Sequence, residues 1–234
     1  MAEPLLKVRG LQAWYGDAQA LFGVDLHVMA GEVVTILGRN GMGKTTTLRA
    51  IMGIMPRRKG AVVFAGRDLM TTPLHRVARA GLGYVPEERG IFASLTVAEN
   101  LLLPPGVAEG GMSIDEIHEL FPNLHERRHS MGNQLSGGEQ QMLAIARILR
   151  TGVRMILLDE PTEGLAPVIV NRIGEVLQRL RAKGMTVLLV EQNFRFAARV
   201  SDRFYLMDHG VVTEGFPTSE LAARQADLSR VLGV

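Results

Sequence analysis

The residues best suited to chemistry fall in three short stretches, and the first is a glycine loop. The segment 38–45, GRNGMGKT, fits G-x-x-x-x-G-K-[ST] with Gly38, Gly43, Lys44 and Thr45 at the fixed positions. In such a loop backbone amides surround phosphates, the lysine reaches the β- and γ-phosphates, and the hydroxyl is a ligand of Mg²⁺. A chance glycine turn is the alternative, and four fixed positions recur in about one chain in a hundred of this length. An apolar run before the loop and a helical pattern after it favour phosphate binding.

The second stretch places two carboxylates at the end of an apolar run. In RMILLDEPT, Asp159 and Glu160 follow residues typical of a buried strand. Open α/β sheets bind ligands at the carboxyl ends of their strands. We therefore expect Asp159 to hold Mg²⁺ and Glu160 to orient or deprotonate an attacking water. A helix-capping role would be equally favoured for this pair alone, but the nearby phosphate loop favours catalysis.

The third stretch, QLSGGEQQMLAIAR at 134–147, reads as a helix whose first turn is open to an anion. Ser136 is placed to cap the helix, and Glu139 to complete a capping box with it. Gly137 and Gly138 leave the backbone amides accessible to a phosphate. Taken alone, this stretch would be an ordinary helix start roughly one time in three. A chain with one phosphate loop would then carry a second, separate phosphate contact.

The elements that must position these residues alternate between strand and helix. Apolar runs predict strands near 31–38, 60–66, 82–86, 154–161, 185–192 and 203–215, and helical patterns cover 45–55, 139–150 and 168–183. This alternation indicates an α/β fold with a mainly parallel core sheet. We expect one domain of residues 1–234, with a core at 1–90 and 151–234 and an inserted helical lobe at about 91–150. The tail 217–234 has the pattern of a terminal amphipathic helix.

Composition excludes several function classes. The 234 residues are 47% hydrophobic and contain no cysteine, which excludes disulfides, thiolate metal sites and cysteine nucleophiles. The formal net charge of +2 comes without a basic stripe, so a nucleic-acid partner is a minority expectation, roughly one in ten. No secretion signal and no apolar run long enough to span a membrane are expected. Any role at a membrane would therefore require a partner.

The three stretches, in this order and spacing, resemble the ATP-binding cassette (ABC) family over about Leu6 to Leu221. The resemblance implies a P-loop ATPase with an antiparallel β region, ATP and Mg²⁺ as cofactors, and two cassettes packed head to tail. Each ATP would lie between the phosphate loop of one subunit and the signature LSGGE of the other. Tyr15 matches the aromatic residue that stacks on adenine, although a core aromatic at a strand end is the alternative. The remaining ATP contacts implied are Gly38, Arg39, Asn40, Gly41, Met42, Gly43, Lys44, Thr45, Thr46 and, for the partner's ATP, Ser136, Gly137, Gly138 and Glu139.

Three residues depart from the family pattern. Glu87 stands where the family usually has a glutamine that senses Mg²⁺, and Gln192 stands where it has a histidine that holds the γ-phosphate. Ala166 replaces an acid of the subunit-contacting loop. Glu87 can still bind a hard cation, and Gln192 keeps two amide donors toward phosphate. We expect Lys44, Glu160 and Gln192 to serve catalysis, Thr45, Asp159 and Glu87 to serve the metal, and hydrolysis to be slower than with a histidine.

The same departures indicate one subfamily within the ABC family. The segments YVPEERGIFASLTVAENL, LSGGEQQMLAIARIL, LLDEPTEGLAP and LLVEQN closely resemble one of the two ATPases of branched-chain amino acid importers. This implies a peripheral subunit on the cytoplasmic face of the membrane, with integral permease subunits, a second histidine-bearing cassette and, indirectly, a substrate-binding protein as partners. A homodimer is the alternative to that heterodimer. A urea or amide importer, a soluble ABC ATPase not coupled to transport, and a catalytically weak regulatory subunit remain open.

Overall fold

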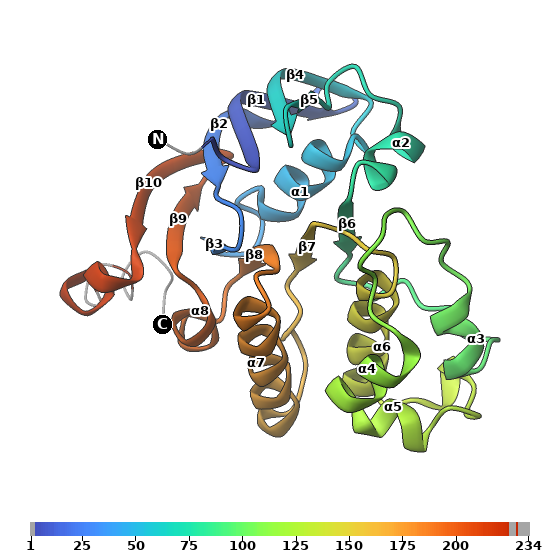
Figure 1. The fold of residues 1–234 in the computed structure, drawn as a ribbon. Helices are drawn as coiled ribbons and strands as arrows, with labels where there is room; N and C mark the ends of the chain where they lie inside the picture. The colour runs from blue at the N-terminus through green and yellow to red at the C-terminus, as the bar shows by residue number, and fades with distance from the viewer. Residues whose placement is uncertain (1–2, 225–227, 229–234) are drawn as a thin grey trace.

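A six-stranded sheet forms the centre of the computed structural model, which describes residues 3–224 and 228 (Figure 1). Its strand order is β10-β9-β3-β8-β7-β6, and the pairs between β9 and β6 are parallel whereas β10 runs antiparallel to β9. The bounds are β3 (Val33–Leu37), β6 (Leu82–Val85), β7 (Met155–Asp159), β8 (Thr186–Glu191), β9 (Arg203–Asp208) and β10 (Val211–Pro217). Every residue of β3, β7 and β8 is buried. Burial on both faces explains why these strands read as continuous apolar runs.

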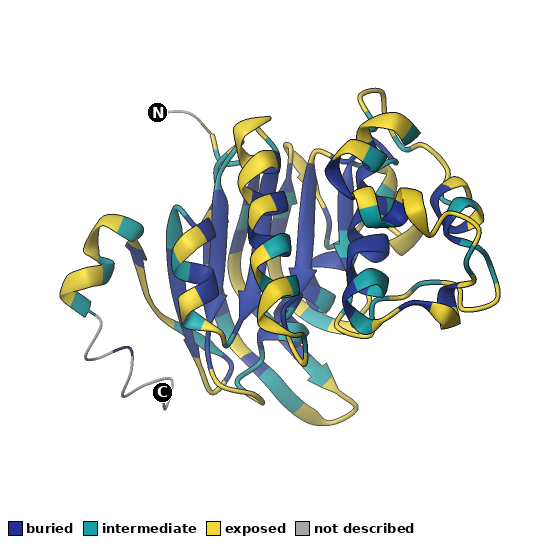
Figure 2. Ribbon diagram, turned by 90° about the horizontal axis from the view of Figure 1, so that it is seen from below, coloured by how far each residue is buried: buried dark blue, intermediate teal, exposed yellow. Residues whose placement is uncertain are grey.

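The two faces of the central sheet belong to different hydrophobic cores. In β7, Leu157 packs into one core and its neighbours Ile156 and Leu158 into the other. The same alternation holds in β8, where Leu188 and Leu189 lie in different cores. Figure 2 shows the sheet as a continuous buried layer, with helices that bury one side and expose the other. Because side chains point to opposite faces every second residue, one strand contributes to both cores.

A second, antiparallel sheet has the strand order β2-β1-β4-β5. Its strands are β1 (Leu6–Tyr15), β2 (Ala18–Val28), β4 (Arg57–Phe64) and β5 (Arg67–Asp68). The sequence analysis predicted the strand near 60–66 but did not place β1 and β2. Their pairing contains register shifts, and Gly10, Gly16 and Gly23 adopt positive φ angles. These irregularities break the strict alternation by which strands are predicted.

Within the described residues, one group of named helices accompanies the two sheets and a second group gathers at one end of the molecule. The first group is α1 (Lys44–Met52), α2 (Leu74–Arg79), α7 (Pro167–Ala182) and α8 (Phe194–Val200). The second group, α3 (Val97–Leu102), α4 (Ile114–Leu120), α5 (Pro122–Glu126) and α6 (Gly137–Leu149), lies together beside β6 (Figure 1). Short 3-10 turns occupy Gly132–Gln134 (η1) and Thr218–Glu220 (η2). The short helices α2 and α8 were not predicted from the sequence.

The expected terminal helix at 217–234 lies partly outside the described residues; within them, β10 ends at Pro217, the η2 turn follows, and residues 221–224 are helical. Among the residues that the structure describes, no helix is long and apolar enough to cross a membrane.

Candidate nucleotide-binding site

The phosphate loop connects β3 to α1, as the motif requires. Gly41 and Gly43 have φ angles of 81° and 102°, a conformation that L side chains rarely adopt. At Gly38 an added Cβ would lie 2.7 Å from the carbonyl oxygen of Met207, so only glycine fits. Lys44, the first residue of α1, is 3% exposed, and its Nζ donates to the carbonyl of Arg39 at 3.0 Å. The sequence thus folds into a loop that holds a buried ammonium group.

Asp159, at the end of β7, joins the phosphate loop to β6. Its Oδ1 accepts a hydrogen bond of 2.8 Å from Thr45 Oγ1, and its Oδ2 accepts one of 2.8 Å from Tyr84. Burial, aided by the nearby charges of Glu160 and Glu87, outweighs these hydrogen bonds and raises the pKa of Asp159. Burial likewise raises the pKa of Tyr84. Tyr84 was not predicted to be a site residue, because its sequence signal is only that of a short apolar strand at 82–86.

Glu160 forms an ion pair with the buried lysine of the loop. Its Oε1 lies 2.9 Å from Nζ of Lys44, and the two side chains are 9% and 3% exposed. The backbone of Glu160 is left-handed, with φ of 44°, which is unusual for a residue other than glycine. A hydrogen bond shared with Glu160, together with burial, raises the pKa of Glu163 to about 7. Glu163 begins the segment 163–166 that the resemblance assigns to subunit contacts, and it is a second carboxyl beside Glu160.

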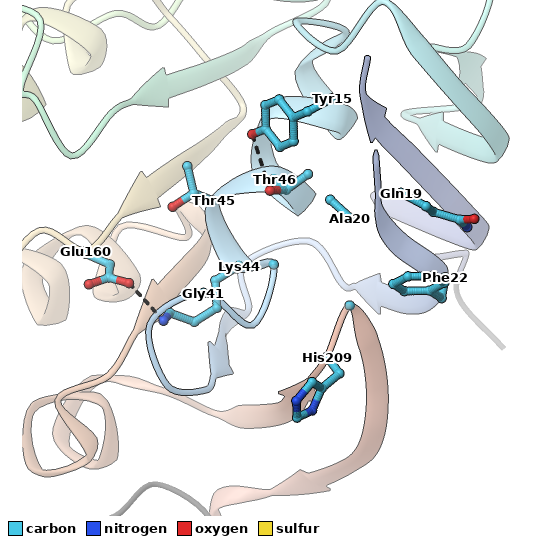
Figure 3. A pocket seen from close by; sticks show the side chains of 12 residues that line it. Tyr15, Gln19, Ala20, Phe22, Gly41, Lys44, Thr45, Thr46, Glu160 and His209 are labelled. Carbon is cyan, nitrogen blue, oxygen red and sulfur yellow. Dashed lines mark hydrogen bonds and ion pairs between the residues drawn. The ribbon is translucent and has the colours of Figure 1, made fainter. Parts of the chain in front are cut away.

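A cavity of about 460 Å³ opens beside the phosphate loop (Figure 3). Tyr15 forms part of its wall, is 49% exposed, and lies 3.3 Å from Thr46 Oγ1 through its hydroxyl. Of the predicted loop residues, Gly38, Arg39, Asn40 and Met42 do not line the cavity. Five lining residues were not anticipated: Gln19, Ala20, Phe22, His209 and Gly210. The complete lining is Tyr15, Gln19, Ala20, Phe22, Gly41, Gly43, Lys44, Thr45, Thr46, Glu160, His209 and Gly210.

The predicted second phosphate contact lies elsewhere, at the first turn of α6. Ser136 caps the helix by accepting from the Glu139 amide at 3.3 Å, and Glu139 accepts from the Ser136 amide at 2.8 Å. Partial burial opposes ionisation of Glu139, but these hydrogen bonds and Arg127, 3.4 Å away, lower its pKa. Ser136 and Glu139 line a separate groove of about 700 Å³ between α5, α6 and α7. The structure therefore does not bring the two glycine stretches of one chain into one cavity.

Gln192 and Glu87 stand at the margins of the site. Gln192 directly follows β8 and is half-buried, whereas Glu87 is exposed in the loop after β6. Neither residue lines the cavity. The residue before Gln192 is a buried carboxyl, Glu191, whose oxygens accept hydrogen bonds from Thr162 Oγ1 at 2.8 Å and the Asn193 amide at 3.1 Å. Burial raises the pKa of Glu191 to about 7.

The oxygen atoms at the loop suit Mg²⁺. The Thr45 hydroxyl and the Asp159 carboxylate are hard ligands held 2.8 Å apart. Over residues 3–224 and 228, no group of three or more His, Asp or Glu side chains is placed to hold a metal ion. A Mg²⁺ ion at this pair would therefore take most of its ligands from phosphate and water, as this ion commonly does.

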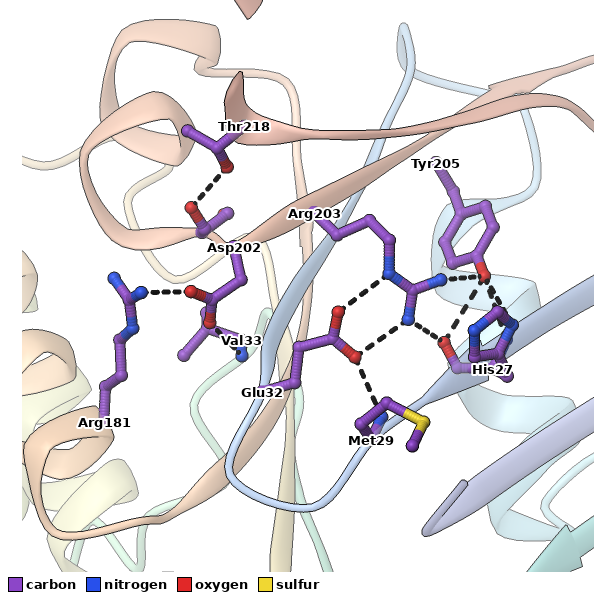
Figure 4. A network of polar contacts seen from close by, with 10 residues as sticks. His27, Met29, Glu32, Val33, Arg181, Asp202, Arg203, Tyr205 and Thr218 are labelled. Atoms are coloured by element: carbon purple, nitrogen blue, oxygen red, sulfur yellow. Dashed lines mark hydrogen bonds and ion pairs between the residues drawn. The ribbon is translucent and has the colours of Figure 1, made fainter. Parts of the chain in front are cut away.

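A second polar cluster shares no residue with the cavity and holds the sheets together (Figure 4). Arg203 of β9 donates to both carboxylate oxygens of Glu32, at 2.7 and 2.8 Å. Asp202 accepts from the Val33 amide at 2.9 Å and pairs with Arg181 of α7. Burial opposes ionisation of Glu32, but the hydrogen bonds from Arg203 and the Met29 amide lower its pKa below the usual value. These residues position β3 and have no contact with the site.

The parallel sheet, the phosphate loop at the end of β3 and the acidic pair at the end of β7 define a P-loop nucleoside triphosphatase. The sequence profile of the family described as "ABC transporter" matches residues 21–163. The chain belongs to this family and is an ATP-hydrolysing ABC cassette.

Curated relatives carry more specific names. The chain is 40% identical over 209 residues to the high-affinity branched-chain amino acid transport ATP-binding protein BraG of Pseudomonas aeruginosa, with 88% of this chain and 90% of that protein covered. It is 37% identical over 222 residues to the lipopolysaccharide export system ATP-binding protein LptB of Escherichia coli, with 92% of each covered. The two similarities are close in extent although the names describe different cargoes.

Solved structures agree with the fold. A nucleotide-free ATP-binding cassette from an ABC transporter superimposes with a TM-score of 0.84 at 25% identity, covering 99% of both chains. The dimeric ABC transporter cassette MJ0796 gives a TM-score of 0.78 at 27% identity, covering 91% of this chain and 98% of that one. The predicted α/β cassette fold and the predicted ATPase activity are thereby confirmed. Cassettes of this family dimerise and work with membrane permease subunits.

Proposed function

We propose that the chain is the ATPase subunit of an importer of branched-chain amino acids. The observation that carries the proposal is the set of paired side chains at the end of β7, where Thr45 meets Asp159 and Lys44 meets Glu160, in a chain 40% identical to BraG. Lipopolysaccharide export is the second candidate, supported by the 37% identity to LptB. A urea or amide importer is a third cargo class, suggested by the sequence resemblance alone.

The side chains at the cavity have different roles in ATP binding and hydrolysis. In this proposal the Tyr15 ring stacks on adenine, and Lys44 turns from Glu160 to the β- and γ-phosphates when ATP enters. Glu160, released from the ion pair, then orients the attacking water. Thr45 and Asp159 hold Mg²⁺, which neutralises charge on the phosphates.

The first turn of α6 serves the other half of a dimer. Ser136, Gly137, Gly138 and Glu139 lie outside the chain's own cavity, so we propose that they contact ATP held by a partner cassette. Gln192 approaches the γ-phosphate from the end of β8 with its amide donors. Because a neutral amide attracts phosphate less than an imidazolium does, Gln192→His should raise the ATPase turnover. An unchanged rate would contradict this role.

For transport, a pair of cassettes that closes around ATP must act on a membrane partner. We propose that this chain sits on the cytoplasmic face of the membrane, paired with a second, histidine-bearing cassette and bound to two permease chains. A substrate-binding protein on the opposite face would deliver the cargo. Closure is favoured because each ATP gains its full set of contacts only in the closed dimer.

The test is affinity purification of the tagged chain from its native membranes with Mg-ATP, followed by mass spectrometry. A Glu160→Gln chain should retain ATP and hold the complex together, and a Glu175→Gln chain, altered on the exposed side of α7, is the control. Recovery of permease chains with ATP-dependent leucine uptake in proteoliposomes would support import. Recovery of lipopolysaccharide export partners would assign the chain to lipopolysaccharide export, and uptake of urea in place of leucine would assign it to a urea importer. Recovery of no membrane protein would refute the transporter role.

A further inference from the structure

Arg89 connects the loop after β6 to the first turn of α6. Nη1 of Arg89 donates a hydrogen bond of 3.0 Å to Oε1 of Gln140. The guanidinium also lies against Gly137, where an added Cβ would come within 3.1 Å of Nη2 of Arg89. The arginine thus uses the space that Gly137, having no side chain, leaves open above the helix.

Gln140 extends this contact to the segment that leads into α6. Its Nε2 donates to the carbonyl oxygens of Gly132 at 3.1 Å and of Leu135 at 3.3 Å. Both ends of the amide are therefore engaged, which fixes its orientation. Leu135 directly precedes Ser136, the N-cap of α6. A continuous series of hydrogen bonds leads from Arg89 to the backbone that presents Ser136.

At its other end, Arg89 belongs to the loop that carries Glu87. The Arg89 amide donates to the carbonyl of Pro86 at 2.9 Å, which closes a tight turn around Glu87 and Glu88. Arg89 has a φ of 67°. A left-handed backbone at a residue other than glycine persists where surrounding contacts hold it. A displacement of Glu87 would therefore move the guanidinium rather than be absorbed within the turn.

We propose that Arg89 is a positioning residue that couples the chain's own ATP cavity to its signature turn, 136–139. The inference rests on the proposed function, in which the signature turn contacts the partner's ATP, and on the expectation from the sequence that Glu87 responds to the Mg²⁺ of bound ATP. ATP binding shifts the Glu87 loop, Arg89 carries the shift to Gln140, and the first turn of α6 is reoriented toward the partner. ATP binding in the chain's own cavity thereby affects the second ATP site, which its signature turn completes in the partner.

Amide hydrogen exchange on the purified full-length chain tests this coupling. The probe is Mg²⁺ with the non-hydrolysable analogue AMP-PNP, at a protein concentration where light scattering shows a monomer. The analogue should protect peptides of 38–48 and change the exchange of peptides of 132–142. In Arg89→Ala and in Gln140→Ala the change at 132–142 should fall by about tenfold, the loss expected when one charge-assisted hydrogen bond is removed. Protection at 38–48 and the affinity for the analogue should stay within about twofold.

A matched control removes a different contact of the same loop. Glu88 pairs with Arg49 at 3.4 Å, away from α6, and is well exposed. Glu88→Ala should respond to the analogue as the parent does. Arg89→Lys keeps a donor toward Gln140 and should restore part of the response, which a general loosening of the loop would not allow.

Two results would overturn the coupling. One is an undiminished response at 132–142 in Arg89→Ala; the other is a parent chain that shows no response there although 38–48 is protected. Failure of the analogue to protect 38–48 in the parent would instead refute the proposed ATP site, and the coupling with it. The two kinds of failure are therefore distinguishable in one experiment.

Discussion

Replacing Glu160 by glutamine should tighten nucleotide binding as well as stop hydrolysis. The Glu160 carboxylate neutralises Lys44 at 2.9 Å, and both side chains are nearly buried. Phosphates that recruit Lys44 must displace this carboxylate. A hydrogen bond to a charged group contributes about 1.5–3 kcal/mol, so its removal from the empty state should lower the Kd by about 10- to 100-fold.

The measurement is a titration with AMP-PNP, which separates binding from the loss of hydrolysis. The melting temperature of the empty chain should fall, since Lys44 is left buried without its counter-ion. The same chain with saturating nucleotide should recover most of that loss, because the phosphates then supply the negative charge. Glu163→Gln is the matched control, since Glu163 is hydrogen-bonded to Glu160 and lies outside the pair with Lys44.

An unchanged or higher Kd in Glu160→Gln would refute the reasoning. It would mean that Lys44 keeps its pairing with Glu160 while phosphate is bound. A lower Kd in both Glu160→Gln and Glu163→Gln would also refute it, because the effect would then follow from the total negative charge of the site rather than from one ion pair.

Three further outcomes are expected. Tyr15→Ala should raise the Kd for ATP by about 10-fold, because stacking of a base on an aromatic ring contributes about 1–3 kcal/mol. Tyr15→Trp should leave the Kd unchanged. If Tyr15→Ala bound ATP as tightly as the parent chain, stacking would be excluded. Arg203→Ala should lower the free energy of unfolding at pH 7 by about 3 kcal/mol, since it leaves Glu32 partly buried without its partner. The folded parent holds the pKa of Glu32 below the ordinary value of 4.5, so the deficit should shrink as the pH falls below 4.5 and through that lower pKa; urea titrations at pH 7 and at acidic pH measure it. The pKa of Glu191 is raised to about 7, so the folded chain binds the Glu191 proton more tightly than the unfolded chain does. Protonated Glu191 therefore stabilises the fold below pH 4.5, and this contribution is lost as the pH rises to about 7. Glu191→Gln should flatten the plot of unfolding free energy against pH between 4.5 and 7, and an unchanged slope would contradict the reasoning.

The central sheet could be predicted from the sequence because its strands are buried on both faces. β3, β7 and β8 are buried runs of mostly aliphatic residues, each ended by a glycine or an acidic residue. The antiparallel strands β1 and β2 carry polar residues, glycines at positive φ and register shifts, so no single period describes them. Their position is fixed by the pairing of β2 with β1 and of β1 with β4, and by contacts that form only once the chain is folded.

The site could be predicted where one motif held all of its parts. Lys44 and Thr45 follow from the loop pattern, and Asp159 and Glu160 from their place after an apolar strand. Residues from other elements gave no such signal. Tyr84 bonds Asp159 because β6 pairs with β7, and Phe22 and His209 reach the cavity from β2 and from the turn between β9 and β10. Such residues meet only through the order of strands.

The alternation of β7 and β8 between two cores has a consequence for how this chain can change. Exchange of one aliphatic residue for another alters the volume of a single core and leaves the direction of every other side chain intact. Insertion or deletion of one residue would send each following side chain to the opposite face. In β7 that would turn Asp159 away from Thr45, so the insertion or deletion would disrupt both the nucleotide site and the packing of the two cores. We therefore expect these strands to tolerate substitution and to forbid changes in length.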